Sequence, residues 1–114
     1  MCGIAGFLDP SNSAEPAELE ALARRMAKTL EHRGPDDAGV WVDPGAGIAM
    51  GHQRLSIIDL SAEGHQPMQS ASGRYVVSYN GEVYNFGGLR DDLRSRGHSF
   101  RGESDTEVIL ATIS

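Results

Sequence analysis

The chain has 114 residues, of which 39% are hydrophobic and only 6% aromatic, a composition that suits one small domain with a modest core. Its formal net charge of −6, without any run of Lys or Arg, argues against binding to nucleic acid or to an anionic membrane surface. A lone cysteine excludes an internal disulfide and suits a reducing, cytoplasmic setting, and no leader or long apolar segment is visible. The histidines lack the spacing of metal ligands, so no metal site is expected.

The lone cysteine stands at position 2. Because cysteine is small, we expect an aminopeptidase to remove Met1, which would leave Cys2 with a thiol and a free α-amine on the same Cα. A thiol needs a base to become a strong nucleophile, and an α-amine titrates close enough to neutral pH to take its proton, directly or through one water. Cys2 is therefore a candidate nucleophile. The alternative is that it is a small apolar residue at the start of a buried strand over residues 2–8.

The first half of the chain predicts a helix and two further strands. Residues 16–32 place apolar side chains at the three-four spacing of one buried helix face, with a proline in the first turn and Gly34-Pro35 just beyond the end. Short strands are predicted over residues 39–42 and 47–50, joined by a turn at Asp43-Pro44-Gly45.

The middle of the chain is harder to assign. Residues 51–68 are expected to be irregular, apart from a short extended piece over residues 55–60. A strand is predicted over residues 74–79 and continues at Val83-Tyr84, so the intervening Asn80-Gly81 also fits a tight hairpin turn.

Two helices are predicted in the last third. One covers residues 86–96 and is stopped by Gly97. The other begins at a capping box formed by Ser104 and Glu107, and it runs through Ile113 without a terminating signal. We therefore expect the domain to continue beyond residue 114.

Five stretches together carry a resemblance to a known family. They are, in chain order, Cys2-Gly3-Ile4-Ala5-Gly6, His32-Arg33-Gly34-Pro35-Asp36, Gly51-His52-Gln53-Arg54-Leu55-Ser56-Ile57-Ile58-Asp59, Tyr79-Asn80-Gly81-Glu82-Val83-Tyr84-Asn85 and Ser104-Asp105-Thr106-Glu107. The chain resembles the class II glutamine amidotransferase domain over its whole length. The His-Arg-Gly-Pro-Asp stretch and Gln66-Pro67-Met68 are similar to the glutamine-hydrolysing asparagine synthetases rather than to the phosphoribosyl or hexosamine relatives.

The resemblance implies an α+β fold of the N-terminal-nucleophile hydrolase type, a layered α-β-β-α sandwich with mostly antiparallel sheets. Residues 1–114 would be the N-terminal portion of this glutaminase domain. In that family an ATP-using synthetase domain follows, so ATP and Mg are expected only there and no cofactor is expected in this chain. The family also allows a homodimer of the full-length protein.

The same resemblance assigns the catalytic roles. Cys2 would attack the side-chain amide of L-glutamine with its own α-amine as the base, and the resulting thioester would be hydrolysed to glutamate. Asn80 and Gly81 would form the oxyanion hole, because an Asn amide and a backbone N–H are suitable donors for a tetrahedral oxyanion.

Binding roles are implied for residues on either side of that hole. Arg54 would hold the substrate α-carboxylate, with the backbone of Leu55, Ser56, Ile57 and Ile58 beside it. Glu82 and Asp105 would hold the α-ammonium. Taken singly, each has an ordinary alternative: a solvated arginine, a solvated hairpin glutamate, and an aspartate that complements a helix dipole.

Glutamine hydrolysis is therefore the expected function, with ammonia passed to a synthetase domain that amidates aspartate. No nucleic-acid or membrane partner is expected. The alternative is an inactive, truncated glutamine-binding or scaffold fragment, and intact mass together with alkylation of Cys2 by a glutamine-like electrophile separates the two. A redox-sensing thiol is a weaker alternative, because Cys2 has no resolving cysteine.

Overall fold

A computed structural model describes residues 2–11, 15–56 and 61–113. Its elements are, in chain order, β1 (Gly3–Leu8), α1 (Pro16–Lys28), the 3-10 helix η1 (Glu31–Arg33), β2 (Asp37–Asp43), β3 (Ile48–Arg54), the 3-10 helix η2 (Ala62–Gly64), β4 (Met68–Gln69), β5 (Val76–Val77), α2 (Phe86–Ser95) and α3 (Asp105–Ile113). The fold is mixed α/β with antiparallel sheets: a three-stranded sheet ordered β1-β3-β2 and a two-stranded sheet ordered β4-β5.

The central strand β3 separates two sides of the molecule. Ala49 and Gly51 face α1, where Ala49 forms a buried cluster with Leu19 and Ala23 of the helix. Gly51 is required there because a Cβ would lie 2.9 Å from the Cβ of Ala27. Since side chains alternate along a strand, His52 and Arg54 point to the opposite face.

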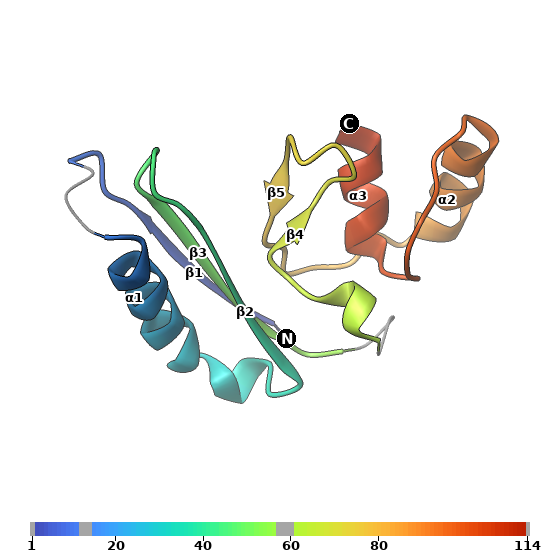
Figure 1. Cartoon of the computed structure of the whole chain (residues 1–114). Coiled ribbons are helices and arrows are strands. Elements are labelled where there is room, and N and C mark those ends of the chain that lie inside the picture. The colour runs from blue at the N-terminus through green and yellow to red at the C-terminus, as the bar shows by residue number, and fades with distance from the viewer. Residues whose placement is uncertain (1, 12–14, 57–60, 114) are drawn as a thin grey trace.

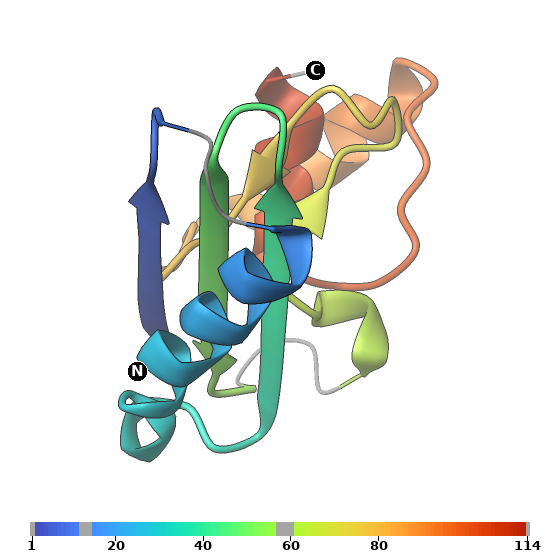
Figure 2. The same ribbon diagram turned by 60° about the vertical axis from the view of Figure 1, so that its left-hand side comes forward.

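That opposite face looks toward the second half of the chain. Figure 1 shows α1 on one side of the three-stranded sheet and β4, β5, α2 and α3 on the other. The turned view in Figure 2 keeps α1 in front of β1, β3 and β2, with α3 behind them. Residues far apart in sequence can therefore meet between the two groups of elements.

Several predictions in the first half had the right elements with the wrong ends. The helix predicted over residues 16–32 ends at Lys28, because Leu30 N–H donates to Ala27 O and tightens the chain into a turn before η1. Strand β3 extends to Arg54, so the expectation of irregular structure from residue 51 was wrong. The cause is pairing on both edges, with β1 and β2, which the sequence around Gly51 does not reveal. The turn predicted at Asp43-Pro44-Gly45 is found at residues 44–47, since Asp43 is still the last residue of β2.

The predicted strand over residues 74–79 is mostly wrong, since only Val76–Val77 pair, with Met68–Gln69. Its continuation at Val83-Tyr84 is wrong too, because Tyr84 begins the turn that leads into α2. The hairpin alternative for Asn80-Gly81 therefore fails. Of the extended piece predicted at residues 55–60, residues 55–56 form no strand and residues 57–60 lie outside the described residues.

Helices α2 and α3 are confirmed with small differences. Gly97 ends α2 with φ of +95°. Ser104 caps α3, since its Oγ accepts from Thr106 N–H at 3.1 Å. Glu107 reaches back further than a capping box requires, and its carboxylate accepts from the N–H groups of Arg101 and Gly102 at 2.7 and 3.0 Å. Among the described residues, no helix has the length and apolarity needed to cross a bilayer.

Candidate functional site

A cavity of about 300 Å³ collects most of the predicted site residues. Those that line it are Cys2, Arg54, Leu55, Asn80, Gly81, Glu82 and Asp105. Ser56 does not line the cavity, and Ile57 and Ile58 lie outside the described residues. The lining thus combines the start of β1, the end of β3, the segment after β5 and the start of α3.

The Cys2 thiol is held at the end of β3. Its Sγ accepts a hydrogen bond from Leu55 N–H at 3.3 Å, and Arg33 Nε donates to the Cys2 carbonyl at 3.1 Å. The residue after Leu55 is anchored as well, because Ser56 N–H donates to Asp36 Oδ2 at 2.8 Å. Two residues of the His-Arg-Gly-Pro-Asp stretch thereby fix the backbone on either side of the thiol.

Arg54 is a buried cation, with 7% of its surface exposed. Its Nη1 donates to the carbonyl of Ser61 at 2.7 Å. The guanidinium also packs on Gly64, where a Cβ would lie 2.6 Å from Arg54 Cζ. A planar group held in this way presents a defined edge to the cavity, which suits recognition of a carboxylate.

The segment that contains Asn80 and Gly81 is positioned by side chains rather than by a strand partner. Tyr79 N–H donates to Gln66 Oε1 at 2.7 Å, and the Tyr79 carbonyl accepts from His52 Nε2 at 3.1 Å. The Tyr79 ring lies against Gly81, where a Cβ would come within 2.6 Å of the tyrosine hydroxyl. Both backbone groups of the residue before Asn80 are therefore fixed.

His52 is fully buried, and its other ring nitrogen, Nδ1, has no hydrogen-bond partner among the described residues. Burial lowers the pKa of His52 below 6.5; Arg54 also lowers it, against the hydrogen bond to Tyr79, which raises it. A neutral ring with its proton on Nε2 satisfies these surroundings, because only that tautomer donates to the Tyr79 carbonyl. It is burial, and not this hydrogen bond, that favours the uncharged ring.

The two predicted acids differ in their surroundings. Asp105 is 6% exposed, and its Oδ2 accepts from Val83 N–H at 2.9 Å, so it ties the first turn of α3 to the chain after Gly81. Glu82 is exposed at the edge of the cavity. Across residues 2–11, 15–56 and 61–113, no group of three or more His, Cys, Asp or Glu side chains is arranged to hold a metal ion.

Comparison with known proteins assigns the chain to a family. The family model described as a glutamine amidotransferase domain matches residues 1–114. The chain belongs to the glutamine amidotransferase domain family. The resemblance inferred from the sequence motifs is thereby confirmed.

Curated relatives place this glutamine amidotransferase domain beside the asparagine synthetases. It is 41% identical over 112 residues to asparagine synthetase [glutamine-hydrolyzing] 1 of Bacillus subtilis, covering 98% of this chain and 17% of the relative. It is 40% identical over 111 residues to asparagine synthetase B [glutamine-hydrolyzing] of Escherichia coli, covering 97% and 19%. Amidase chry2 of Gibberella zeae is 37% identical over 119 residues, covering 97% and 17%. The chain thus spans less than a fifth of the length of these relatives.

Sequence reasoning missed several residues that build the site of this amidotransferase domain. His52, Gln66 and Thr106 were not predicted to take part, yet Gln66 Nε2 donates to Thr106 Oγ1 at 3.2 Å while its Oε1 holds Tyr79. His52 would have been a signal, as a polar side chain inside a strand, only if β3 had been predicted to continue past residue 50. Gln66 gave no comparable signal, because its partners are 13 and 40 residues away.

Proposed function

We propose that this domain hydrolyses L-glutamine to glutamate and ammonia through a thioester on Cys2. Support comes from one observation: the cavity is lined by a thiol, a buried arginine, an Asn-Gly pair and two acids, drawn from sequence positions 2 to 105. A free amino acid with a side-chain amide needs each of these groups. We further infer the layered α-β-β-α arrangement of N-terminal-nucleophile hydrolases, which the family and the antiparallel sheets favour.

In the proposed mechanism, the α-amine of Cys2, free after removal of Met1, takes the thiol proton. The thiolate sulfur then attacks the side-chain amide carbon of glutamine, and the carbonyl oxygen becomes an oxyanion. Asn80 Nδ2–H and Gly81 N–H donate to that oxyanion, which stabilises charge that is absent from the ground state.

The ammonium on Cys2 then returns its proton to the leaving nitrogen, and ammonia departs as the thioester forms. The amine next takes a proton from water, the hydroxide attacks the thioester, and glutamate leaves with the thiol restored. Throughout, Arg54 holds the α-carboxylate, while Glu82 and Asp105 hold the α-ammonium.

We also propose that the ammonia is passed to a synthetase domain that amidates aspartate. The names of the Bacillus subtilis and Escherichia coli relatives support this acceptor. The similarity to amidase chry2 makes a different ammonia acceptor the alternative to be tested.

The deciding experiment compares two forms of the full-length gene product that differ only at the N-terminus. Intact mass identifies a form that starts at Cys2 and a form that retains Met1 through an uncleaved extension. We expect glutaminase activity, and labelling of Cys2 by a glutamine-like electrophile, only in the first form. An amide nitrogen cannot act as the base, so normal turnover with Met1 retained would refute the mechanism. Cys2→Ala is the control for residual activity.

A further inference from the structure

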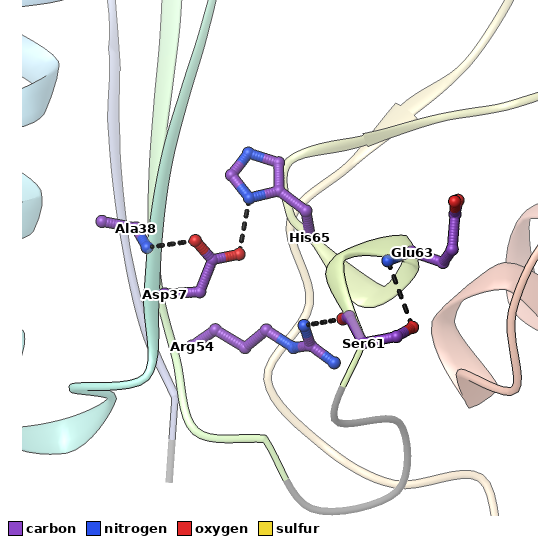
Figure 3. A network of polar contacts seen from close by, with 6 residues as sticks. All are labelled: Asp37, Ala38, Arg54, Ser61, Glu63 and His65. Atoms are coloured by element: carbon purple, nitrogen blue, oxygen red, sulfur yellow. Dashed lines mark hydrogen bonds and ion pairs between the residues drawn. The ribbon is translucent and has the colours of Figure 1, made fainter.

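Residues 61–66 form a loop, called here the 61–66 loop, that contacts both strand β2 and the Arg54 side chain. Figure 3 shows Arg54 reaching toward Ser61 while His65, from the same loop, points back to Asp37. The loop begins at Ser61, whose Oγ accepts from Glu63 N–H at 3.2 Å and so caps the short helix η2.

The loop contacts Arg54 at two points. Ser61 supplies a carbonyl that accepts from Arg54 Nη1 at 2.7 Å. Gly64 is buried against the guanidinium, with no room for a Cβ. Any displacement of the loop would therefore move the guanidinium, which lines the cavity.

His65 anchors the loop to β2. Its Nδ1–H donates to Asp37 Oδ2 at 2.6 Å, while Asp37 Oδ1 accepts from Ala38 N–H at 2.9 Å. Asp37 is the direct partner of Arg54 in the β2–β3 register, so the anchor is beside the residue that the loop holds. Gly39, on the same strand, lies so close that a Cβ would come 2.6 Å from His65 Nε2.

An exposed pair of this kind contributes little to stability. The side chains of His65 and Asp37 are 46% and 32% exposed, and such surface pairs are typically worth 1 kcal/mol or less. A stabilising role therefore does not account for the geometry. Its position does, because the pair joins β2 to the loop that makes both contacts on Arg54.

We propose that His65, held by Asp37, is a positioning residue: it fixes the 61–66 loop against Arg54 and thereby sets the affinity for the α-carboxylate of the substrate. This inference rests on the proposed glutaminase function. His65 does not line the cavity, so it would act on binding through the loop.

The test uses two amide substitutions in the full-length gene product. In His65→Asn the side-chain nitrogen falls near the position of Nδ1, so the hydrogen bond to Asp37 is kept. In His65→Gln the nitrogen falls near the position of Nε2, so the bond is lost while polarity and size are retained. Arg24→Ala, which removes an exposed pair with Glu20 on α1, is the control for losing a surface contact.

Each variant is assayed with L-glutamine and with 4-aminobutanamide, which is glutamine without its α-carboxylate. For His65→Gln we expect KM for glutamine to rise by about tenfold with kcat unchanged, less than the roughly hundredfold that a 1 Å misplacement can cost. For 4-aminobutanamide we expect the same kcat/KM as in the parent protein, because that substrate does not use Arg54. His65→Asn and Arg24→Ala should stay within about twofold of the parent protein for both substrates.

Three results would each overturn the proposal: equal losses with both substrates, no loss in His65→Gln, or unfolding of His65→Gln measured by circular dichroism. His65 would then have a purely structural role or no role in the site. Failure of the proposed function looks different. In that case the parent protein itself hydrolyses no glutamine and its Cys2 is not labelled by a glutamine-like electrophile.

Discussion

Protonation of His52 should destabilise the domain. The ring is fully buried and donates from Nε2 to Tyr79 O, and burial lowers its pKa below the ordinary value of 6.5. In the unfolded chain the ring takes up a proton as pH falls through 6.5, whereas the folded chain resists that proton. The stability that depends on neutral His52 is therefore present above pH 6.5 and lost progressively as pH falls below it.

Linkage limits the size of the effect. One proton taken up on unfolding changes the free energy of unfolding by at most about 1.4 kcal/mol per pH unit. Between pH 6.5 and 5.5 the part of the loss that comes from His52 should stay below this value, at no more than about 1 kcal/mol, because the unfolded ring is only half protonated at pH 6.5.

The assay is urea unfolding between pH 5 and 8, followed through hydrogen exchange of peptides from β3. His52→Gln keeps a donor near the position of Nε2 and does not titrate, so its stability should lack the part of the pH slope that the parent protein shows below 6.5. His32→Gln, at an exposed position of η1, should keep the slope. An unchanged slope in His52→Gln would refute the reasoning, because the proton would then be taken up elsewhere.

Three further predictions concern the site and the core. Asn80→Ala should lower kcat by a factor on the order of 10²–10³ at similar KM, whereas Arg54→Ala should mainly raise KM for glutamine. Steady-state kinetics, combined with melting temperatures, distinguishes both effects from a folding defect. Val108→Ala should lower the free energy of unfolding by about 2 kcal/mol, measured by urea unfolding, since Val108 is fully buried in α3 and loses two methyl groups. Gly39→Ala should raise KM for glutamine and lower the melting temperature, because the new Cβ displaces the 61–66 loop. Gly88→Ala is the contrasting substitution: Gly88 has open space around it in α2, so the free energy of unfolding should rise by up to about 1 kcal/mol.

Local patterns were enough to predict the helices and the outer parts of the large sheet. The apolar spacing in α1, the stop at Gly97 and the cap at Ser104 act within one or two turns, so they can be read from neighbouring residues. The predicted strand ended before the observed end of β3, because a glycine such as Gly51 is typical of a strand end. In the structure Gly51 is instead a point of close approach to Ala27.

The cavity could be anticipated only through the family resemblance. Cys2, Arg54 and Asp105 are far apart in sequence, and no periodicity indicates that they line one cavity. The groups that position them were harder still. Gln66 holds Tyr79 and Thr106 across 13 and 40 residues, and such contacts follow from the packing of the whole chain.

The alternation along β3 also constrains how domains of this family can change by insertion and deletion. Arg54 lines the cavity, and His52 points to the same side of β3, because the turn at residues 44–47 sets the pairing of β3 with β2. One residue gained or lost in that turn, if absorbed as a shift of β3, would rotate Gln53 toward the cavity and send its two neighbours toward α1. A change in the length of this surface turn would therefore alter the site even though no residue of the turn lines the cavity.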